Sequence, residues 1–389
     1  MRLEDDAIVA AVESVAPGVR QVAAKIHASP ELRFEEHNAS AWLSEALEKA
    51  GHPVERGLAG MPTSFRARAG RAGGARVAIL AEYDALPEIG HACGHNLIAG
   101  GALGAFLALA SRAEDLPGEV VILGTPAEEG GGGKIKLLEA GAFEGVDAAM
   151  MFHPFDRDLL AHPTLANAYV TFTYRGRASH AAVAPWDGRS ALTACIQTFN
   201  LVDSQRVHLK DGDRVHGFIT NGGDAVNIIP ELASCEFSAR AFDSAELERV
   251  IEIVTRCGRG AALACGVEVD VEVRRGYRDM KNNLALARRF GAHLERFGRA
   301  PKELDPDVGT GSTDMGDVSH AVPSIHPWLA ICDENETTCH QREFAACANS
   351  ERGYASMVVA AKAMALLARD VLADEELRAA AKREHGGAR

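Results

Sequence analysis

Cys93 and His95 are the first residues whose types and spacing suggest chemistry. A thiolate and an imidazole are both good ligands for zinc or a similar divalent ion. Gly94 lies between them, and its conformational freedom lets the backbone bend so that both side chains face one point. The pair alone does not distinguish a metal site from a buried thiol beside a surface histidine.

Two adjacent carboxylates, Glu128 and Glu129, follow an apolar run and Pro126 and precede four glycines. Adjacent side chains point in different directions, so one carboxylate can bind a metal ion while the other faces the substrate as a base. A solvated acidic loop is the alternative. A phosphate-binding loop fits poorly, because the glycines lead into Lys134-Ile135 and not into Lys followed by Ser or Thr.

His153 and His340 complete the candidate residues, although either histidine taken singly is compatible with a structural role. His153 follows the apolar run 146–152, as Glu82 and Asp84 follow the run 75–81 and the two glutamates follow the run 119–124. Short apolar runs between helical spacers predict a mixed, largely parallel sheet covered by helices. Sites in such sheets lie beyond the carboxyl ends of the strands, so these side chains are expected to converge in one crevice.

The sequence pattern changes near residue 166, where apolar and polar residues begin to alternate, and they alternate again in residues 267–273. This alternation predicts half-exposed antiparallel strands. Helical patterns at 190–208 and 246–264 and a further strand at 234–242 suggest an inserted α+β domain of ferredoxin-like order. We therefore expect a catalytic domain in residues 1–165 and 279–389, with an inserted lid and dimerisation domain at 166–278.

The first domain begins with an amphipathic helical pattern, and we expect that helix to break near Pro17. A second helical pattern predicts a long C-terminal helix over residues 351–371. With 389 residues, 47% hydrophobic and 24% charged, the chain should fold as a soluble protein of two domains. The formal net charge of -13 and the lack of a long basic run favour a small-molecule partner over nucleic acid or an anionic membrane.

No signal-peptide pattern opens the sequence and no uninterrupted apolar stretch reaches membrane-spanning length, which predicts a cytoplasmic location. The eight cysteines form no CxxC pair, so they are expected to be free thiols.

Six stretches in order resemble the M20 family of metallo-aminoacylases, dipeptidases and carboxypeptidases, in particular its amidohydrolase branch. The stretches are residues 27–32 (HASPEL), 82–87 (EYDALP), 91–96 (HACGHN), 126–129 (PAEE), 179–182 (SHAA) and 227–230 (NIIP). Residues 216–223 (HGFITNGG) and 311–316 (GSTDMG) look most like the subgroup of peptidase M20 domain-containing protein 2 and p-aminobenzoyl-glutamate hydrolases. This resemblance covers nearly the whole chain.

The resemblance implies a two-metal hydrolase. Two divalent ions, zinc or manganese with cobalt as a third candidate, would be held by Cys93, His95, Glu129, His153 and His340, with Cys93 as the bridge. Glu128 would be the general base, collecting a proton from water and delivering it to the leaving amine.

The resemblance also gives roles outside the ligand set. Asp84 would orient a ligand imidazole. His180, Asn227 and Arg240 of the inserted domain would reach the substrate, with His180 acting from the other subunit of a homodimer and donating to the oxyanion. The alternative for Arg240 is a surface ion pair on a strand.

One position departs from the common branch pattern. Asn96 stands where many members have aspartate, which suggests a difference in substrate preference or in the charge around the ligands. Glu82, by contrast, fits this branch, which lacks the histidine that other branches have at that position. No role follows from the sequence for His91, Asp314 or Met315.

The expected function is hydrolysis of the amide bond of a dipeptide or an N-acyl amino acid. The alternatives are an aminobenzoyl-glutamate or N-acyl-aromatic amidohydrolase, a deaminase on the same scaffold, or a non-hydrolytic binding protein. Glu128 beside a full ligand set argues against the binding protein, because binding alone needs no base.

Overall fold

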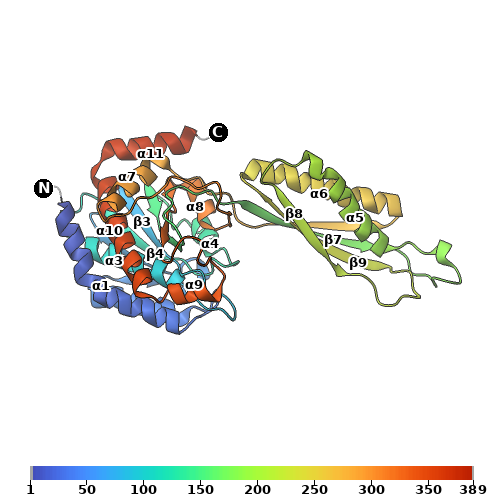
Figure 1. Cartoon of the computed structure of the whole chain (residues 1–389), viewed down its shortest axis with the longest axis horizontal. Coiled ribbons are helices and arrows are strands. Elements are labelled where there is room, and N and C mark those ends of the chain that lie inside the picture. The colour runs from blue at the N-terminus through green and yellow to red at the C-terminus, as the bar shows by residue number, and fades with distance from the viewer. Residues whose placement is uncertain (1–2, 388–389) are drawn as a thin grey trace. The chain divides into compact units, whose positions relative to one another are not determined.

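The computed structural model describes residues 3–387 and divides the chain into two compact units. Unit 1 comprises Met1–Pro163 and Met280–Arg389, and unit 2 comprises Thr164–Asp279 (Figure 1). Unit 2 is therefore an insertion between the two halves of unit 1.

Unit 1 is built on a six-stranded sheet of order β1-β2-β4-β3-β5-β11. Its strands are β1 (Val54–Arg56), β2 (Phe65–Gly70), β3 (Arg76–Ala81), β4 (Glu119–Gly124), β5 (Ala148–Met150) and β11 (Ser324–Ile325). The neighbours β4, β3, β5 and β11 are parallel, whereas β1 and β2 add an antiparallel edge. The predicted mixed, largely parallel sheet is confirmed.

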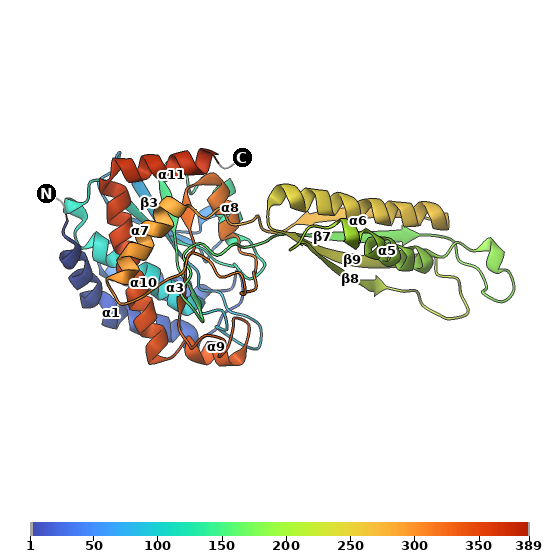
Figure 2. The same cartoon turned by 45° about the horizontal axis from the view of Figure 1, so that its top comes forward.

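The central strands are buried on both faces. In β3, Val77 and Ile79 belong to the larger hydrophobic core, and Ala78 and Leu80 belong to a second core on the other face. The period-two geometry of a strand makes this division. Helices complete both cores (Figures 1 and 2), namely α1 (Asp5–Ala28), α2 (His37–Lys49), α3 (His95–Ala110), α4 (Gly133–Glu139), α7 (Leu284–Glu295), α8 (Met315–Ala321), α9 (Arg342–Cys347), α10 (Glu351–Ala373) and α11 (Glu375–Gly387).

Helix α3 is the central helix of unit 1 and is buried along nearly its whole length. It packs against α1, α10 and the strands β3 and β4. Glycines allow this close packing: a Cβ on Gly100 would lie 2.3 Å from the Met357 sulfur, and one on Gly101 would lie 2.5 Å from the Phe152 ring. His95 is the first residue of α3, so the close packing of this helix fixes the backbone position from which the His95 side chain extends.

Helix α1 corrects one expectation, because it continues through Pro17. Proline removes one intrahelical hydrogen bond, but Pro17 is exposed, so water can satisfy the freed carbonyl. Val12 before it and Val19 after it are both buried in the core, which holds the helix together. By length and composition alone α1 could cross a membrane, yet its apolar side packs against α3 and α10.

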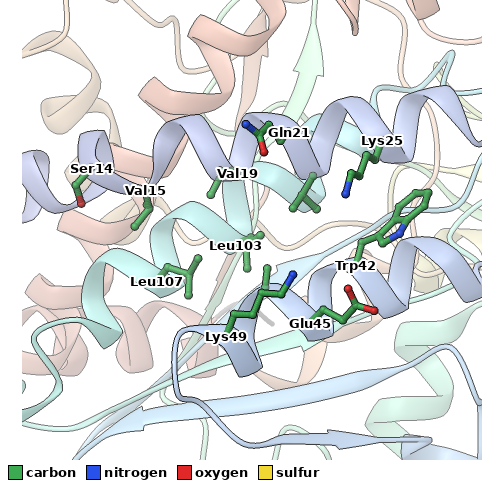
Figure 3. A pocket seen from close by; sticks show the side chains of 13 residues that line it. Ser14, Val15, Val19, Gln21, Lys25, Trp42, Glu45, Lys49, Leu103 and Leu107 are labelled. Carbon is green, nitrogen blue, oxygen red and sulfur yellow. The ribbon is translucent and has the colours of Figure 1, made fainter.

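A groove of about 390 Å³ runs along α1, α2 and α3 (Figure 3). Val19, Trp42, Leu103 and Leu107 form its apolar wall, and Lys25, Glu45 and Lys49 lie at its edge. None of the residues predicted to bind metal or substrate lines it.

Unit 2 has the element order strand, helix, strand, strand, helix, strand, and the sequence gives a range for only one of the two middle strands. The elements are β7 (Ala166–Arg175), α5 (Ala191–Gln205), β8 (Arg214–Asn221), β9 (Leu232–Ala241), α6 (Ser244–Cys265) and β10 (Glu268–Arg275). The antiparallel sheet has the order β10-β7-β9-β8, and α5 and α6 share its apolar core (Figure 2).

Candidate metal centre

The predicted ligands of unit 1 lie together. Ligand atoms fall within 4.8 Å of one another in the group Cys93, His95 and His153, and again in the group Cys93, Glu129 and His340. Cys93 belongs to both groups, so its sulfur lies where a bridging ligand would lie. Glu128 completes a third group with His95 and Glu129.

These residues lie close to the ends of strands and helices. The two glutamates follow β4, His95 opens α3, and His153 opens the short strand β6 (His153–Phe155), which pairs with β12 (Trp328–Ala330). The His340 amide donates a hydrogen bond of 2.8 Å to the Ala92 carbonyl, which brings the last ligand beside Cys93. The convergence expected at the carboxyl ends of the strands is thus present.

The backbone is strained where it presents these groups. Ala127 and His340 have φ values of 61° and 70°, although neither is glycine. Such conformations cost about 1–3 kcal/mol each and persist only where the surrounding structure imposes them. One lies directly before Glu128 and the other at the predicted ligand His340, so the surrounding structure fixes the backbone at two places that present candidate site residues.

Asp84 orients His95 and also connects it to the glutamate loop. One carboxylate oxygen lies 3.0 Å from His95 Nδ1, and the other accepts the Glu129 amide at 2.9 Å. Burial alone would lower the pKa of His95, but the charge of Asp84 outweighs it and raises that pKa well above its ordinary value. Because Nδ1 faces Asp84, Nε2 is the ring nitrogen that a metal ion could bind in place of a proton.

Several donor atoms in the centre lack the partners that buried polar atoms normally have. His95 Nε2 and Glu129 Oε1 are buried and make no hydrogen bond of good geometry among the described residues, although each lies within 3.5 Å of an ionisable side chain. Cys93 Sγ lies 3.5 Å from His153 Nε2, and His340 Nε2 lies 3.3 Å from Glu129 Oε1. Sulfur, imidazole and carboxylate donors converging in this way fit divalent transition-metal ions.

The two adjacent glutamates have different environments. Burial, followed by the charge of Glu129, raises the pKa of Glu128 well above its ordinary value. Burial acts in the same direction on Glu129, but its contact with His340 outweighs burial and lowers the pKa of Glu129. Carboxylates whose pKa values are driven apart commonly divide acid–base and charge-holding roles.

Other buried groups border the centre without having been given a role from the sequence. Glu82, Lys134 and Asp314 form a fully buried cluster, and Glu82 reaches His95 Nε2 at 3.5 Å. The ring of His326 lies 5.4 Å from that of His153, and Cys339 contacts Cys93. Glu82 was expected in this crevice from its place after an apolar run, although no role was assigned to it, whereas nothing in the sequence pairs Lys134 with Asp314.

The predicted substrate residues of unit 2 do not all lie together. The His180 and Asn227 segments run side by side, because Ala181 N donates to Asn227 O at 2.9 Å and His180 pairs with Ile228. Arg240 stands near the other end of β9, about 26 Å of strand beyond Leu232 at roughly 3.3 Å per residue. That end adjoins the points where the chain enters and leaves unit 2. Their contact with substrate stays a prediction.

Comparisons with known proteins point in one direction. The model of peptidase family M20/M25/M40 matches residues 78–369. The chain is similar to the Xaa-Arg dipeptidase of Mus musculus, with 39% identity over 93% of this chain and 87% of that protein. It is also 28% identical to a component of the p-aminobenzoyl-glutamate hydrolase of Escherichia coli, over 99% of this chain and 94% of the relative.

The fold is also similar to that of a dinuclear metal-binding peptidase of family M20 from Bacillus subtilis. The TM-score is 0.73 and the identity 21%, with 93% of this chain and 99% of that chain covered. This likeness agrees with the predicted fold class.

Changing Gly94 to Ala should weaken metal binding. Gly94 has a φ of 77°, and an added Cβ would lie 2.8 Å from Pro154 Cγ, so Cys93 and His95 would have to move. We expect a loss of metal affinity of about 10–100-fold, measured by competition with a chromogenic chelator. Gly57→Ala is the matched control, because Gly57 has a φ of 75° with nothing within 4 Å of the added carbon. Equal affinities in the two variants would contradict this account of Gly94.

Proposed function

The chain belongs to peptidase family M20/M25/M40 and is a metal-dependent hydrolase, and from this premise we propose that it cleaves the amide bond of a dipeptide with two divalent ions. The observation that carries the proposal is the sharing of Cys93 between two ligand groups beside Glu128. One ion would lie between Cys93, His95 and His153, and the other between Cys93, Glu129 and His340. Zinc or manganese suits this mixed donor set, and cobalt is a third candidate.

The ions, when bound, would lower the pKa of a coordinated water towards neutrality and polarise the scissile carbonyl. Glu128 would take the proton of the attacking water and deliver it to the leaving amine. Asp84 would keep the His95 proton on Nδ1 and so keep Nε2 aimed at the ion.

A dipeptide with a basic C-terminal residue is the first substrate we propose, because the relative named Xaa-Arg dipeptidase is 39% identical over most of both chains. p-Aminobenzoyl-glutamate or another N-acyl amino acid is the second candidate, supported by the hydrolase relative that matches 99% of the chain. His180, Asn227 and Arg240 are the residues we propose for substrate contact.

The test is a substrate panel with added zinc, manganese or cobalt. Dipeptides ending in Arg or Lys should be hydrolysed fastest, and a chelator should abolish turnover until metal is restored. Faster cleavage of p-aminobenzoyl-glutamate would favour the second candidate. Full activity in demonstrably metal-free protein would overturn the whole proposal.

Changing Glu128 to Gln should lower kcat by about 10²–10⁴-fold, the usual contribution of a general base, while both metal ions stay bound. The adjacent Glu129→Gln change removes the same charge and should instead reduce metal content. Metal per chain and kcat are measured on both variants. The reverse pattern would mean that the two glutamates exchange roles.

We also propose that the protein is a homodimer joined through unit 2. Strand β8 is an edge of the sheet, and its residues Phe218 and Ile219 are 61% and 38% exposed. They line an apolar groove together with Ile196 and Phe199 of α5. Exposed apolar edges pair readily with another strand. The opposite edge, β10, carries alternating exposed charges, such as Glu268, that discourage pairing.

Changing Phe218 to Asp should convert the dimer to monomers, as measured by light scattering across a concentration series. A buried carboxylate at an apolar interface is costly unless it finds a partner. Leu263→Asp is the control, since Leu263 is 85% exposed on α6 of the same unit. A monomeric wild-type protein, or an unchanged mass in Phe218→Asp, would count against the proposed interface.

A further inference from the structure

Behind the metal centre lies a buried ammonium enclosed by carboxylates. Lys134 Nζ lies 2.5 Å from Glu82 Oε1 and 2.5 Å from Asp314 Oδ1, and all three side chains are fully buried. The Lys134 amide also donates to the second oxygen of Asp314 at 3.0 Å. Asp314 thus binds both the charge and the backbone of Lys134.

The same carboxylates surround Glu128. Oxygen atoms of Glu82, Glu128 and Asp314 lie within 4.8 Å of one another, a grouping that could itself hold a cation. The Lys134 ammonium already contacts two of its three members. Burial would lower the pKa of Lys134, but Asp314, Glu82 and Glu128 together raise it, so the ammonium stays charged. Lys134 therefore occupies the position of a third cation.

Lys134 cannot contact a substrate, because no part of it is exposed. It can act through its neighbours: Glu82 reaches His95 Nε2 at 3.5 Å, and Glu128 is the proposed base. A backbone contact also connects the helix that carries Lys134 to the loop that carries Glu128. Gly133 packs so closely on the Pro126 carbonyl that a Cβ there would lie 1.8 Å away, which joins the start of α4 to the loop that presents Glu128.

We propose that Lys134 is a positioning residue whose ammonium serves as a built-in third cation, holding Glu82 and Asp314 so that Glu128 is correctly placed for proton transfer. This inference rests on the proposed function, because it assumes that Glu128 is the base. It assigns roles to three residues beyond the metal ligands: Lys134 as the cation, and Glu82 and Asp314 as the groups through which it acts. Removal of the charge leaves three carboxylates that repel one another.

The first test is Lys134→Met, which keeps much of the side-chain volume and loses the charge. We expect kcat to fall by about 10²-fold, as for a catalytic group that is misplaced, with KM little changed and the metal content of wild type retained. A kcat near that of wild type would overturn the proposal. Loss of the metal ions together with activity would also overturn it, because Lys134 would then support metal binding.

The second test is chemical rescue of Lys134→Ala with n-propylammonium, which replaces the atoms removed. It should raise kcat saturably, and propan-1-ol, a neutral molecule of similar size, should not. The melting temperature of the metal-free variant should rise with the amine alone, and this readout holds even if the wild type hydrolyses none of the amides tested. Equal effects of amine and alcohol would show that only packing matters and would refute a cationic role.

A double variant tests the charge argument even if the single variant Lys134→Met is too unstable for kinetic measurements. Lys134→Met with Asp314→Asn removes one positive and one negative charge, so the net charge of the buried cluster is restored. It should melt at a higher temperature and turn over faster than Lys134→Met alone. A double variant no better than the single one would contradict the charge argument.

Discussion

The concentration of negative charge and lone-pair donors in a buried space is the constraint on which the rest of unit 1 depends. Glu82, Glu128 and Asp314 lie within 4.8 Å of one another beside a second set of donors around Cys93. Buried carboxylates cannot remain ionised without cations close by. The fold meets this demand in two ways, with an ammonium tethered to α4 and with a set of atoms suited to divalent ions.

The fold that gathers these groups could largely be predicted from the sequence. The apolar runs have the length and continuity of strands buried on both faces, and β3 and β4 are such strands. Since parallel strands end at one edge, the polar groups after each run had to meet there. Spacing alone left Cys93 and His95 ambiguous, and the resemblance to a known family supplied the ligand set.

Other features could not be predicted, because they arise only from tertiary contacts. Lys134 follows a glycine-rich loop, where the sequence excludes a phosphate site but suggests nothing else, and its partner Asp314 is 180 positions away. The break expected at Pro17 was wrong for a similar reason: local propensity predicts an interruption, while packing of α1 on α3 and α10 maintains the helix. Local sequence patterns do not show which distant residues will form an ion pair. They also do not show that tertiary packing can hold together a helix that contains a proline.

A tethered ammonium and an exchangeable metal ion differ in a way that bears on catalysis. Lys134 is present at a fixed stoichiometry whatever the metal supply, and Asp314 holds its amide as well as its charge. The positive charge that Lys134 places beside Glu82 and Asp314 therefore does not depend on the metal supply. Three carboxylates with a third exchangeable ion would bind it in competition with the neighbouring metal sites. An ammonium built into the chain avoids that competition, which would favour a lysine over another metal ion behind the proposed base Glu128.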